Sequence, residues 1–443
     1  MSLLTFKGGA HPYDGKVFSM NCPIEEYKPT GEMVFPMAQH IGAPAKPVVN
    51  VGDRVLMGQL IGEKAGFISA NIHSSVSGTV KKIEPRLVAT GGMVNSIIIE
   101  NDGLYEKAEP LHNLDPEKMT REEVISVVEA AGIVGMGGAG FPTNVKLSPK
   151  EPDKIDSIIV NAAECEPYLT SDYRRMLEQP QELVKGLKVV LNMFPNAMGY
   201  FGIEDNKPEA IKIMSEAVKD EDRIQVKVLK TKYPQGGERS LIYAITKRKL
   251  SSKKLPADLG CIVHNVDTIY AIYHAVYEGE PLTTRIVTVT GDAINTPKNL
   301  QVYLGTSLKE LVDYCGGFKE EPEKIISGGP MMGFSFYDLN VPALKGSSSV
   351  LAFLKDVVAA NDESPCIRCG RCAAACPQGL LPMKLAHMSA NNEMEEFKKC
   401  YGMECVECGC CSYVCPAKRQ VTQSVKSMKK KVLAEARKNQ EAK

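Results

Sequence analysis

The sequence predicts a multidomain α/β chain made of four modules in series. Its 443 residues exceed what one ordinary hydrophobic core organises, which indicates three or four domains. In the middle of the chain, short β-branched runs alternate with segments of helical periodicity, as expected of helices packed on a parallel sheet. Near the C-terminus, one spacing of cysteines occurs twice. A β-rich module before the alternating stretch and a small αβ module after it complete the prediction.

The C-terminal module contains two runs of the form C-x2-C-x2-C-x3-C-P. Their cysteines are Cys366, Cys369, Cys372 and Cys376, followed by Cys405, Cys408, Cys411 and Cys415. This is the spacing of ferredoxins that hold two [4Fe-4S] clusters. Paired C-x2-C units also bind zinc, but a zinc ribbon would leave half of each run without a role. The runs therefore predict an α-rich double-cluster ferredoxin domain at residues 358–420 that transfers single electrons.

Resemblance to two-cluster ferredoxins also implies which cysteines share a cluster. Cys415 would complete the cluster held by the first three cysteines of the first run, and Cys376 would complete the other. Cys400 and Cys410 lie in or beside the second run and are alternative ligands, although either one would break the match between the two runs.

Composition narrows the class of protein further. The 53 basic and 53 acidic residues balance, and Trp is absent, which argues against nucleic acid as a partner. No apolar stretch reaches the roughly 18 residues of a membrane span, and the N-terminus lacks a signal-peptide core. Fourteen cysteines with eight in the paired runs fit a reducing compartment, so Cys22, Cys165, Cys261 and Cys315 are expected to be free thiols. We expect a chain without a transmembrane span that stays inside the cell.

The β-rich module follows an N-terminal segment at residues 1–30 and covers residues 31–103. Its phrases V-G-D-x-V-x-x-G-Q and V-S-G-T-V resemble the barrel-sandwich hybrid fold of lipoyl and biotinyl carriers, in which a hairpin-tip Lys holds the prosthetic group. Here Phe67 occupies that place and Lys64 is out of register. We therefore expect the module to serve docking or support rather than carriage.

The α/β domain is predicted at residues 115–283, after a polar linker. Asp115-Pro116 indicates a helix start, and Val124, Val127 and Val128 fall on one helical face. The runs IDSIIVN and IQVKVLK are typical of strands, and QELVKGLKVVLNMF and EAIKIMSEAV of helices between them. The alternation predicts a parallel sheet.

A glycine-rich run lies within this domain. Gly135, Gly137 and Gly140 match G-x-G-x-x-G, but the run follows a predicted helix rather than a strand, which disfavours a standard Rossmann turn. Together with Gly138, these glycines let the backbone approach a flat or phosphorylated ligand without a Cβ clash.

Four motifs in order resemble the NADH-oxidising flavoprotein subunit of complex I. They are GMGGAGFPTNVKL (135–147), IVNAAECEPYLTSD (159–172), YPQGGERSL (233–241) and IVHNVDT (262–268). The segments TSLKELVDYCGG and KIISGGPMMG resemble the SLBB domain, a ubiquitin-like module, at residues 284–345. With the barrel sandwich and the ferredoxin runs, nearly the whole chain is similar to the C subunits of Rnf complexes, which are ion-translocating ferredoxin:NAD oxidoreductases.

This resemblance implies an FMN site and an NADH site, with hydride transfer carried by FMN and no catalytic side chain. The FMN residues would be Gly135, Gly137, Gly138, Gly140, Lys146, Asn161, Glu164, Tyr233, Gly236 and Asn265. Lys146 would meet the phosphate or a flavin oxygen. Phe141, Glu166 and Glu238 would contact NADH. Three positions depart from the complex I pattern, namely Ala163, Gly237 and His264, so the polar contacts to the flavin would differ in detail.

Flavin chemistry also follows from the two kinds of electron carrier. Nicotinamide exchanges a hydride, which carries two electrons, whereas a [4Fe-4S] cluster exchanges one, so a chain that uses both needs a carrier able to do either. Resemblance to Rnf implies a peripheral subunit at the cytoplasmic face of the cell membrane. Its partners would be integral membrane and cluster-bearing Rnf subunits, with ferredoxin as an indirect electron source and sodium or proton translocation in the complex.

Two other functions stay open from the sequence. A soluble flavoprotein cobalamin reductase of propanediol microcompartments shares the GAGFP and NAAECEP segments. A cluster-bearing scaffold or electron wire without flavin is the third hypothesis, since Ala163 and Gly237 depart from the flavin pattern. The remaining residues, 421–443, are predicted to be a polar basic tail whose lysines 429–431 face solvent.

Overall fold

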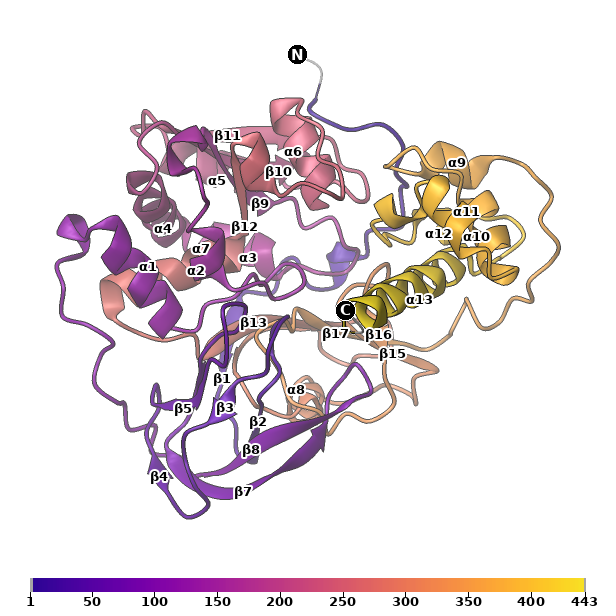
Figure 1. The fold of residues 1–443 in the computed structure, drawn as a ribbon. Helices are drawn as coiled ribbons and strands as arrows, with labels where there is room; N and C mark the ends of the chain where they lie inside the picture. Colours follow the sequence, from indigo (N-terminus) through magenta and orange to yellow (C-terminus); the bar gives the residue numbers. More distant parts are fainter. Residues whose placement is uncertain (1–2, 442–443) are drawn as a thin grey trace.

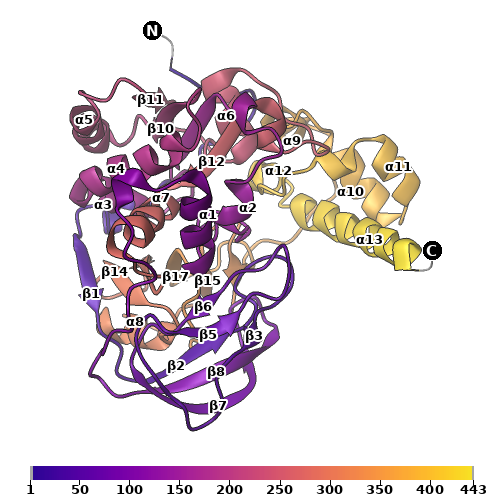
Figure 2. The same ribbon diagram turned by 60° about the vertical axis from the view of Figure 1, so that its left-hand side comes forward.

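The computed structural model describes residues 3–441. Figure 1 shows a parallel α/β domain at the upper left, a small β module at the bottom and a helical module at the right, with a six-stranded sheet near the centre. Turned by 60°, the helical module still projects at the right, and the β module lies at the bottom (Figure 2). None of the helices within residues 3–441 is long and apolar enough to cross a membrane.

The α/β domain is built on a four-stranded parallel sheet in the order β11-β10-β9-β12. Its strands are β9 (Ser157–Ala162), β10 (Met198–Glu204), β11 (Ile224–Leu229) and β12 (Cys261–Asn265). The predicted strands and helices of this region are present, including α4 (Pro180–Asn192) and α5 (Pro208–Ala217). After β9, the chain adds β10 and then β11 on one side of β9. It then crosses back and places β12 on the other side of β9. β9 and β12 therefore flank the switch point where open α/β sheets bind ligands.

Both faces of this sheet are buried. Ile158 and Val160 of β9 belong to the larger hydrophobic core, which includes residues of α4 and of α7 (Val266–Tyr273). Ile159 points to the other face, where it joins Leu241 and Ile242 of α6 (Glu238–Thr246). The near-continuous apolar character of IDSIIVN follows, because alternate side chains of a doubly covered strand enter two different cores.

The predicted start of the first helix at Pro116 is wrong. Residues Pro116–Lys118 form only a single 3-10 turn capped by Asp115, and α1 (Arg121–Ala130) begins after Thr120. Thr120 and Glu123 form a capping box, a pattern that satisfies two free backbone N–H groups. The predicted buried face is correct, since Val124, Val127 and Val128 are buried.

The β module has two sheets, ordered β2-β8-β7-β4 and β3-β5-β6. The strands are β2 (Glu32–Pro36), β3 (Lys46–Pro47), β4 (Arg54–Val55), β5 (Leu60–Glu63), β6 (Ile72–His73), β7 (Gly78–Leu87) and β8 (Met93–Asn101). In the loop between β5 and β6, Phe67 is 79% exposed, whereas Lys64 forms an ion pair with Glu129 of α1. The hairpin that holds the prosthetic group in carrier domains therefore contacts the α/β domain here.

The central sheet has the order β1-β14-β13-β17-β15-β16. It contains β1 (Ile24–Tyr27), β13 (Thr284–Thr290), β14 (Lys298–Tyr303), β15 (Lys324–Ser327), β16 (Phe334–Ser335) and β17 (Ser349–Phe353), with α8 (Leu308–Tyr314) packed against it. β1 pairs in parallel with β14, although the two are far apart in sequence. The N-terminal segment thus completes a sheet formed mainly by the αβ module.

The helical module contains both cysteine runs. Its helices are α9 (Arg371–Ala375), α10 (Pro382–Ala390), α11 (Met394–Lys399), α12 (Cys410–Tyr413) and α13 (Val421–Glu441). The polar tail forms α13, and Val425, Met428 and Val432 on one side of it pack into the core of this module. Lys429 donates to the carbonyl oxygen of Cys405, so it is bound to the module rather than to solvent alone. Residues 442–443 of the predicted tail lie outside the described residues.

Candidate flavin and iron-sulfur sites

Polar side chains meet where β9 and β12 end. Asn161 is the penultimate residue of β9, and its Nδ2 donates to the carbonyl oxygen of Gly236 at 2.8 Å. Asn265 ends β12, and its Nδ2 donates to Asp172 Oδ2 at 2.7 Å. A Cβ on Gly137 would lie 2.9 Å from the Asn265 Cβ. The structure therefore brings all four of the predicted FMN motifs together at the switch point of the sheet.

The glycine-rich loop between α1 and α2 (Thr143–Lys146) is closed on itself. Gly135 N donates to Phe141 O at 2.8 Å, and Gly140 adopts φ +69° against the backbone of His40. Gly137 and Gly138 are exposed, and a Cβ on Gly138 would meet nothing within 4 Å. The loop thus offers open, side-chain-free backbone on its outer side.

Thr268 and Arg285, two residues that the sequence analysis did not assign to the site, hold this loop by hydrogen bonds to Met136. Met136 N donates to Thr268 Oγ1 at 3.1 Å, and Met136 O accepts from Arg285 Nη2 at 2.8 Å. Arg285 comes from β13 of the central sheet and is buried. Its own Nη1 donates to the carbonyl oxygen of Lys345. Thr268 ends the fourth motif but was given no role there, and no motif contains Arg285, which acts on a segment distant in sequence.

Lys146 and Glu238 lie together beside the end of β12. Lys146 Nζ donates to Val263 O at 2.8 Å and lies 3.6 Å from Glu238 Oε1. Glu238 is exposed at the first turn of α6, and Phe141 is half-buried. A partly exposed cation in this place suits an anionic or carbonyl group of a ligand.

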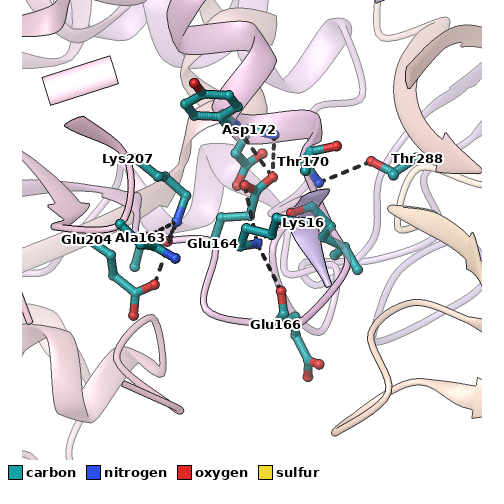
Figure 3. Close-up of polar contacts among 12 residues, drawn as sticks. Lys16, Ala163, Glu164, Glu166, Thr170, Asp172, Glu204, Lys207 and Thr288 are labelled. Atoms are coloured by element: carbon teal, nitrogen blue, oxygen red, sulfur yellow. Dashed lines mark hydrogen bonds and ion pairs between the residues drawn. The ribbon is translucent and has the colours of Figure 1, made fainter. Parts of the chain in front are cut away.

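The two glutamates after β9 are bound by the protein itself, and Figure 3 shows Glu164 beside Lys16 and Asp172. Glu164 Oε1 accepts from Asp172 N at 2.7 Å in the first turn of α3 (Ser171–Glu178), and Lys16 Nζ lies 3.6 Å from Glu164 Oε2. Burial raises the pKa of Glu164. Glu166 Oε2 accepts from Met331 N at 3.1 Å, and burial raises the pKa of Glu166 to about 7. Both carboxylates thus join elements together, and ligand contact by either one stays a prediction.

A layer of buried charges supports the site. Arg175 Nε donates to Asp267 Oδ1 at 3.0 Å, and both side chains are 3% exposed. Lys207 Nζ donates to Ala163 O at 2.7 Å and lies 3.6 Å from Glu204 Oε2. Such buried pairs are costly to break, because each leaves an uncompensated charge. They link α3 to α7, and the residue after β9 to the end of β10.

Some polar atoms near the site have no protein partner. Among residues 3–441, neither side-chain nitrogen nor oxygen of Gln235 has a hydrogen-bond partner, although Gln235 is fully buried between Tyr233 and Gly236. His264 Nε2 is likewise unpaired within these residues, and burial lowers the pKa of His264 to about 3, which keeps it neutral. Buried polar groups normally find partners. The open glycine backbone, Lys146 and these unpaired groups fit a flavin with its polar ring edge and phosphate.

The cysteines separate into two cavities. Cys376, Cys405, Cys408 and Cys411 line one, and Cys366, Cys369, Cys372 and Cys415 line the other. This is the partition that cross-ligation predicts, and four thiols around each cavity fit the donor set of a [4Fe-4S] cluster. We call the first cavity inner, because Cys408 and Cys411 are buried, and the second outer, because Cys366 and Cys369 are exposed. Cys410 lines the inner cavity, and Cys400 is absent from the described lining of both.

The inner cavity adjoins the candidate flavin site. Tyr233 packs in one apolar cluster with Ala10, Ala375, Cys408 and Cys410. The Cys410 Sγ donates to the Tyr233 carbonyl oxygen at 3.7 Å. The outer cavity is lined by Ile367 and His387 among others, and none of its lining residues belongs to the apolar cluster of Tyr233. The two cavities and the flavin motifs therefore form a series.

Comparison with known families confirms the predicted architecture and cofactor-binding domains. The RnfC barrel sandwich hybrid domain matches residues 4–104, the Nuo51 FMN-binding domain 128–274, the SLBB domain 286–335 and the 4Fe-4S dicluster domain 365–419. The order is the one predicted for the modules.

Curated relatives match along almost the whole chain. The C subunit of the proton-translocating ferredoxin:NAD(+) oxidoreductase complex of Clostridium ljungdahlii is 46% identical over 96% of this chain and 94% of the relative. The C subunit of the Na(+)-translocating complex of Acetobacterium woodii is 42% identical, over 98% of both. The C subunit of an ion-translocating oxidoreductase complex of Rhodobacter capsulatus is 41% identical over 86% of this chain and 74% of the relative.

Proposed function

The chain belongs to the family of C subunits of ion-translocating ferredoxin:NAD(+) oxidoreductase complexes, and on this premise we propose that it exchanges electrons between two [4Fe-4S] clusters and NAD(H) through FMN. The observation that carries the proposal is the series formed by the outer cavity, the inner cavity and the flavin motifs. Single-electron carriers placed beside a flavin domain form an arrangement suited to redox chemistry.

The FMN site is proposed at the ends of β9 and β12. Gly137 and Gly138 offer backbone without side chains, Asn161 and Asn265 offer amides, and Lys146 offers a cation. Bound FMN supplies the exchange between one-electron and two-electron carriers. The buried pairs beneath the site keep these groups in place, which is how protein scaffolds contribute to cofactor chemistry.

NADH contacts are proposed at the exposed edge of the same site. Phe141 is half-buried and Glu238 is exposed beside Lys146, so both are accessible to a nucleotide that stacks on the flavin. Glu166 is less accessible, because Met331 N and Tyr233 OH already donate to it. We keep Glu166 in the proposed site only as a group at its inner wall.

The cluster ligands are proposed in the cross-ligated arrangement. Cys376, Cys405, Cys408 and Cys411 would hold the inner cluster, and Cys366, Cys369, Cys372 and Cys415 the outer one. The exposure of Cys366 and Cys369 supports electron entry at the outer cluster from another subunit. Electrons would then pass through the inner cluster toward Tyr233 and the flavin.

The assembly is proposed from the family. The chain would be the peripheral subunit at the cytoplasmic face of a membrane-bound complex, whose integral membrane and cluster-bearing subunits carry electrons from ferredoxin and translocate sodium ions or protons. No observation favours the alternative function as a cobalamin reductase. Residues 4–104 instead match the RnfC-type barrel sandwich.

Anaerobic addition of NADH to the purified chain tests the proposal. We expect the visible flavin absorbance to bleach and acid to release FMN in about one equivalent per chain. A protein that holds clusters but neither releases FMN nor responds to NADH would overturn the proposal and leave the hypothesis of an electron wire.

A further inference from the structure

The N-terminal residues cross the junction between the α/β domain and the cysteine-rich module. In Figure 1 the indigo chain descends from the N-terminus between these two parts. It first follows the edge of the parallel sheet, where Lys230 N donates to Leu4 O at 2.9 Å just beyond β11. Lys232 Nζ then donates to Phe6 O at 2.8 Å and lies 4.4 Å from the centre of the Phe6 ring. Residues 4–6 are thereby bound to the α/β domain.

The next residues contact both parts at once. Gly9 N donates to Ala375 O at 2.8 Å, in the peptide that precedes Cys376. Ala10 N donates to Tyr233 O at 2.8 Å, and Tyr233 N donates to Ala10 O at 2.9 Å. Beyond them, Tyr413 OH donates to His11 O at 3.5 Å. Main-chain hydrogen bonds of two consecutive residues, Gly9 and Ala10, therefore connect the residue before Cys376 to Tyr233 of the candidate flavin site.

The space at this crossing admits only glycine. Gly8 has φ +82°, and a Cβ there would lie 2.6 Å from the carbonyl oxygen of Cys376. Gly9 has φ +87°, and its Cβ would lie 2.7 Å from the carbonyl oxygen of Tyr233. Both conditions disfavour any other residue, since left-handed backbone and close backbone approach are what glycine permits. The cysteine loop and Tyr233 are held as closely as main-chain contact allows.

We infer that residues 4–11 form a strap that sets the separation between the inner cluster and the flavin, and that Gly8 and Gly9 are positioning residues for electron transfer between them. The inference rests on the proposed function. Electron transfer slows steeply with distance, so a device that fixes the distance controls this step without touching either reactant. The barrel sandwich and the hydride step are not involved.

A comparison of two glycine variants tests the strap. Gly8→Ala places a methyl group against Cys376 O, whereas Gly91→Ala makes the same change at φ +85° with nothing within 4 Å of the new Cβ. Backbone strain is matched, and only the first variant pushes the cysteine loop away. Iron, sulfide and FMN contents are measured first in both.

A second pair avoids the cluster loop altogether. Lys232→Met removes the ammonium that holds Phe6, and Lys230→Met makes the same charge change at an exposed position two residues away. If Gly8→Ala loses iron, the comparison of Lys232→Met with Lys230→Met is the test of the strap.

The kinetic measurement separates two steps. Chemically reduced protein is mixed with NAD+, and flavin and cluster absorbance are followed separately. Each NADH formed takes two electrons and one proton, and two one-electron transfers from the clusters replace those electrons. In Gly8→Ala and Lys232→Met we expect NADH formation from the flavin at the wild-type rate, and cluster reoxidation slowed by about tenfold or more, as for a misplaced reactive group.

A second readout needs no turnover. Hydrogen exchange should be faster in Lys232→Met than in Lys230→Met for peptides that cover residues 5–12 and 371–378, because the hydrogen bonds of Gly9 and Ala10 then open more often. Unchanged exchange and unchanged cluster reoxidation in both test variants would overturn the strap. Failure of the wild-type protein to form NADH would instead overturn the proposed function.

Discussion

The flavin site and the cluster sites are built in opposite ways. At the flavin site, the glycine-rich loop is held by Thr268 of α7 and Arg285 of β13, and the surrounding core extends through most of the α/β domain. In the cysteine-rich module, each cavity takes its ligands from two short runs, and the main core consists of Leu380, Leu385, Met388, Phe397, Val425, Met428 and Val432. The first site is formed by packing. The second has little packing of its own and relies on what its cysteines bind.

Removal of iron would test this contrast most severely. After chelation under oxidising conditions, we expect residues 365–419 to lose protection from hydrogen exchange by about a hundredfold or more, roughly 3 kcal/mol, because metal binding and folding are coupled in such modules. Residues of β9 and β12 should keep their protection. Equal loss in both regions would show that the α/β domain also depends on the clusters.

Single cysteine variants sharpen the comparison within the cluster region. Cys415→Ser should remove the electron paramagnetic resonance signal of the outer cluster, although Cys415 belongs to the second run, and Cys376→Ser should remove that of the inner cluster. Cys400→Ser is the control and should leave both signals. Loss of the inner signal in Cys415→Ser would contradict cross-ligation.

A buried charge pair tests the rigidity of the flavin region. Asp267→Asn leaves Arg175 without its carboxylate partner at 3% exposure, so we expect a loss of about 3–5 kcal/mol in the free energy of unfolding of the α/β domain. The matched change Glu216→Gln breaks an exposed pair with Lys219 at the end of α5 and should cost no more than about 0.5 kcal/mol. The free energies of unfolding of both variants are measured by denaturant titration, with the release of FMN as the signal. Similar losses would mean that the buried pair adds no rigidity.

A pH dependence should come from Lys345, which joins the β module to the glycine-rich loop. Its buried Nζ donates to the carbonyl oxygens of Asn71 and Gly132, and burial lowers the pKa of Lys345 to about 7. The neighbouring His40 and His73 have pKa values lowered to about 4 and about 3, so they stay neutral in the range considered.

The sign follows from proton binding. Between pH 7 and about 10, the unfolded chain holds a proton on Lys345 that the folded chain has released, so stability rises with pH in this window. Lys345→Met should lack this rise, which is on the order of a few kcal/mol. Unfolding curves across the window measure the difference. Parallel pH profiles of the two proteins would contradict the assignment.

Much of the molecule could be predicted from local patterns. The cysteine spacing indicated two clusters, the alternation of β-branched runs with helical periods indicated a parallel sheet, and the four motifs indicated a flavin domain. The predicted start of α1 was wrong because Asp115-Pro116 also suits a helix start, while the stronger capping box at Thr120 lay five residues later. The ligand contacts of Glu164, Glu166 and Glu238 stay predictions.

The sequence by itself determined the chemistry of this protein, because ligand spacing, glycine runs and strand periodicity are properties of short segments. The tertiary structure alone decided how the chemistry is connected: β1 completes the central sheet, Arg285 holds Met136, and Gly9 and Ala10 join Ala375, next to Cys376, to Tyr233. The physical reason is that a hydrogen bond or a steric limit between distant segments leaves no local mark on either one. It depends on where folding brings their backbones together.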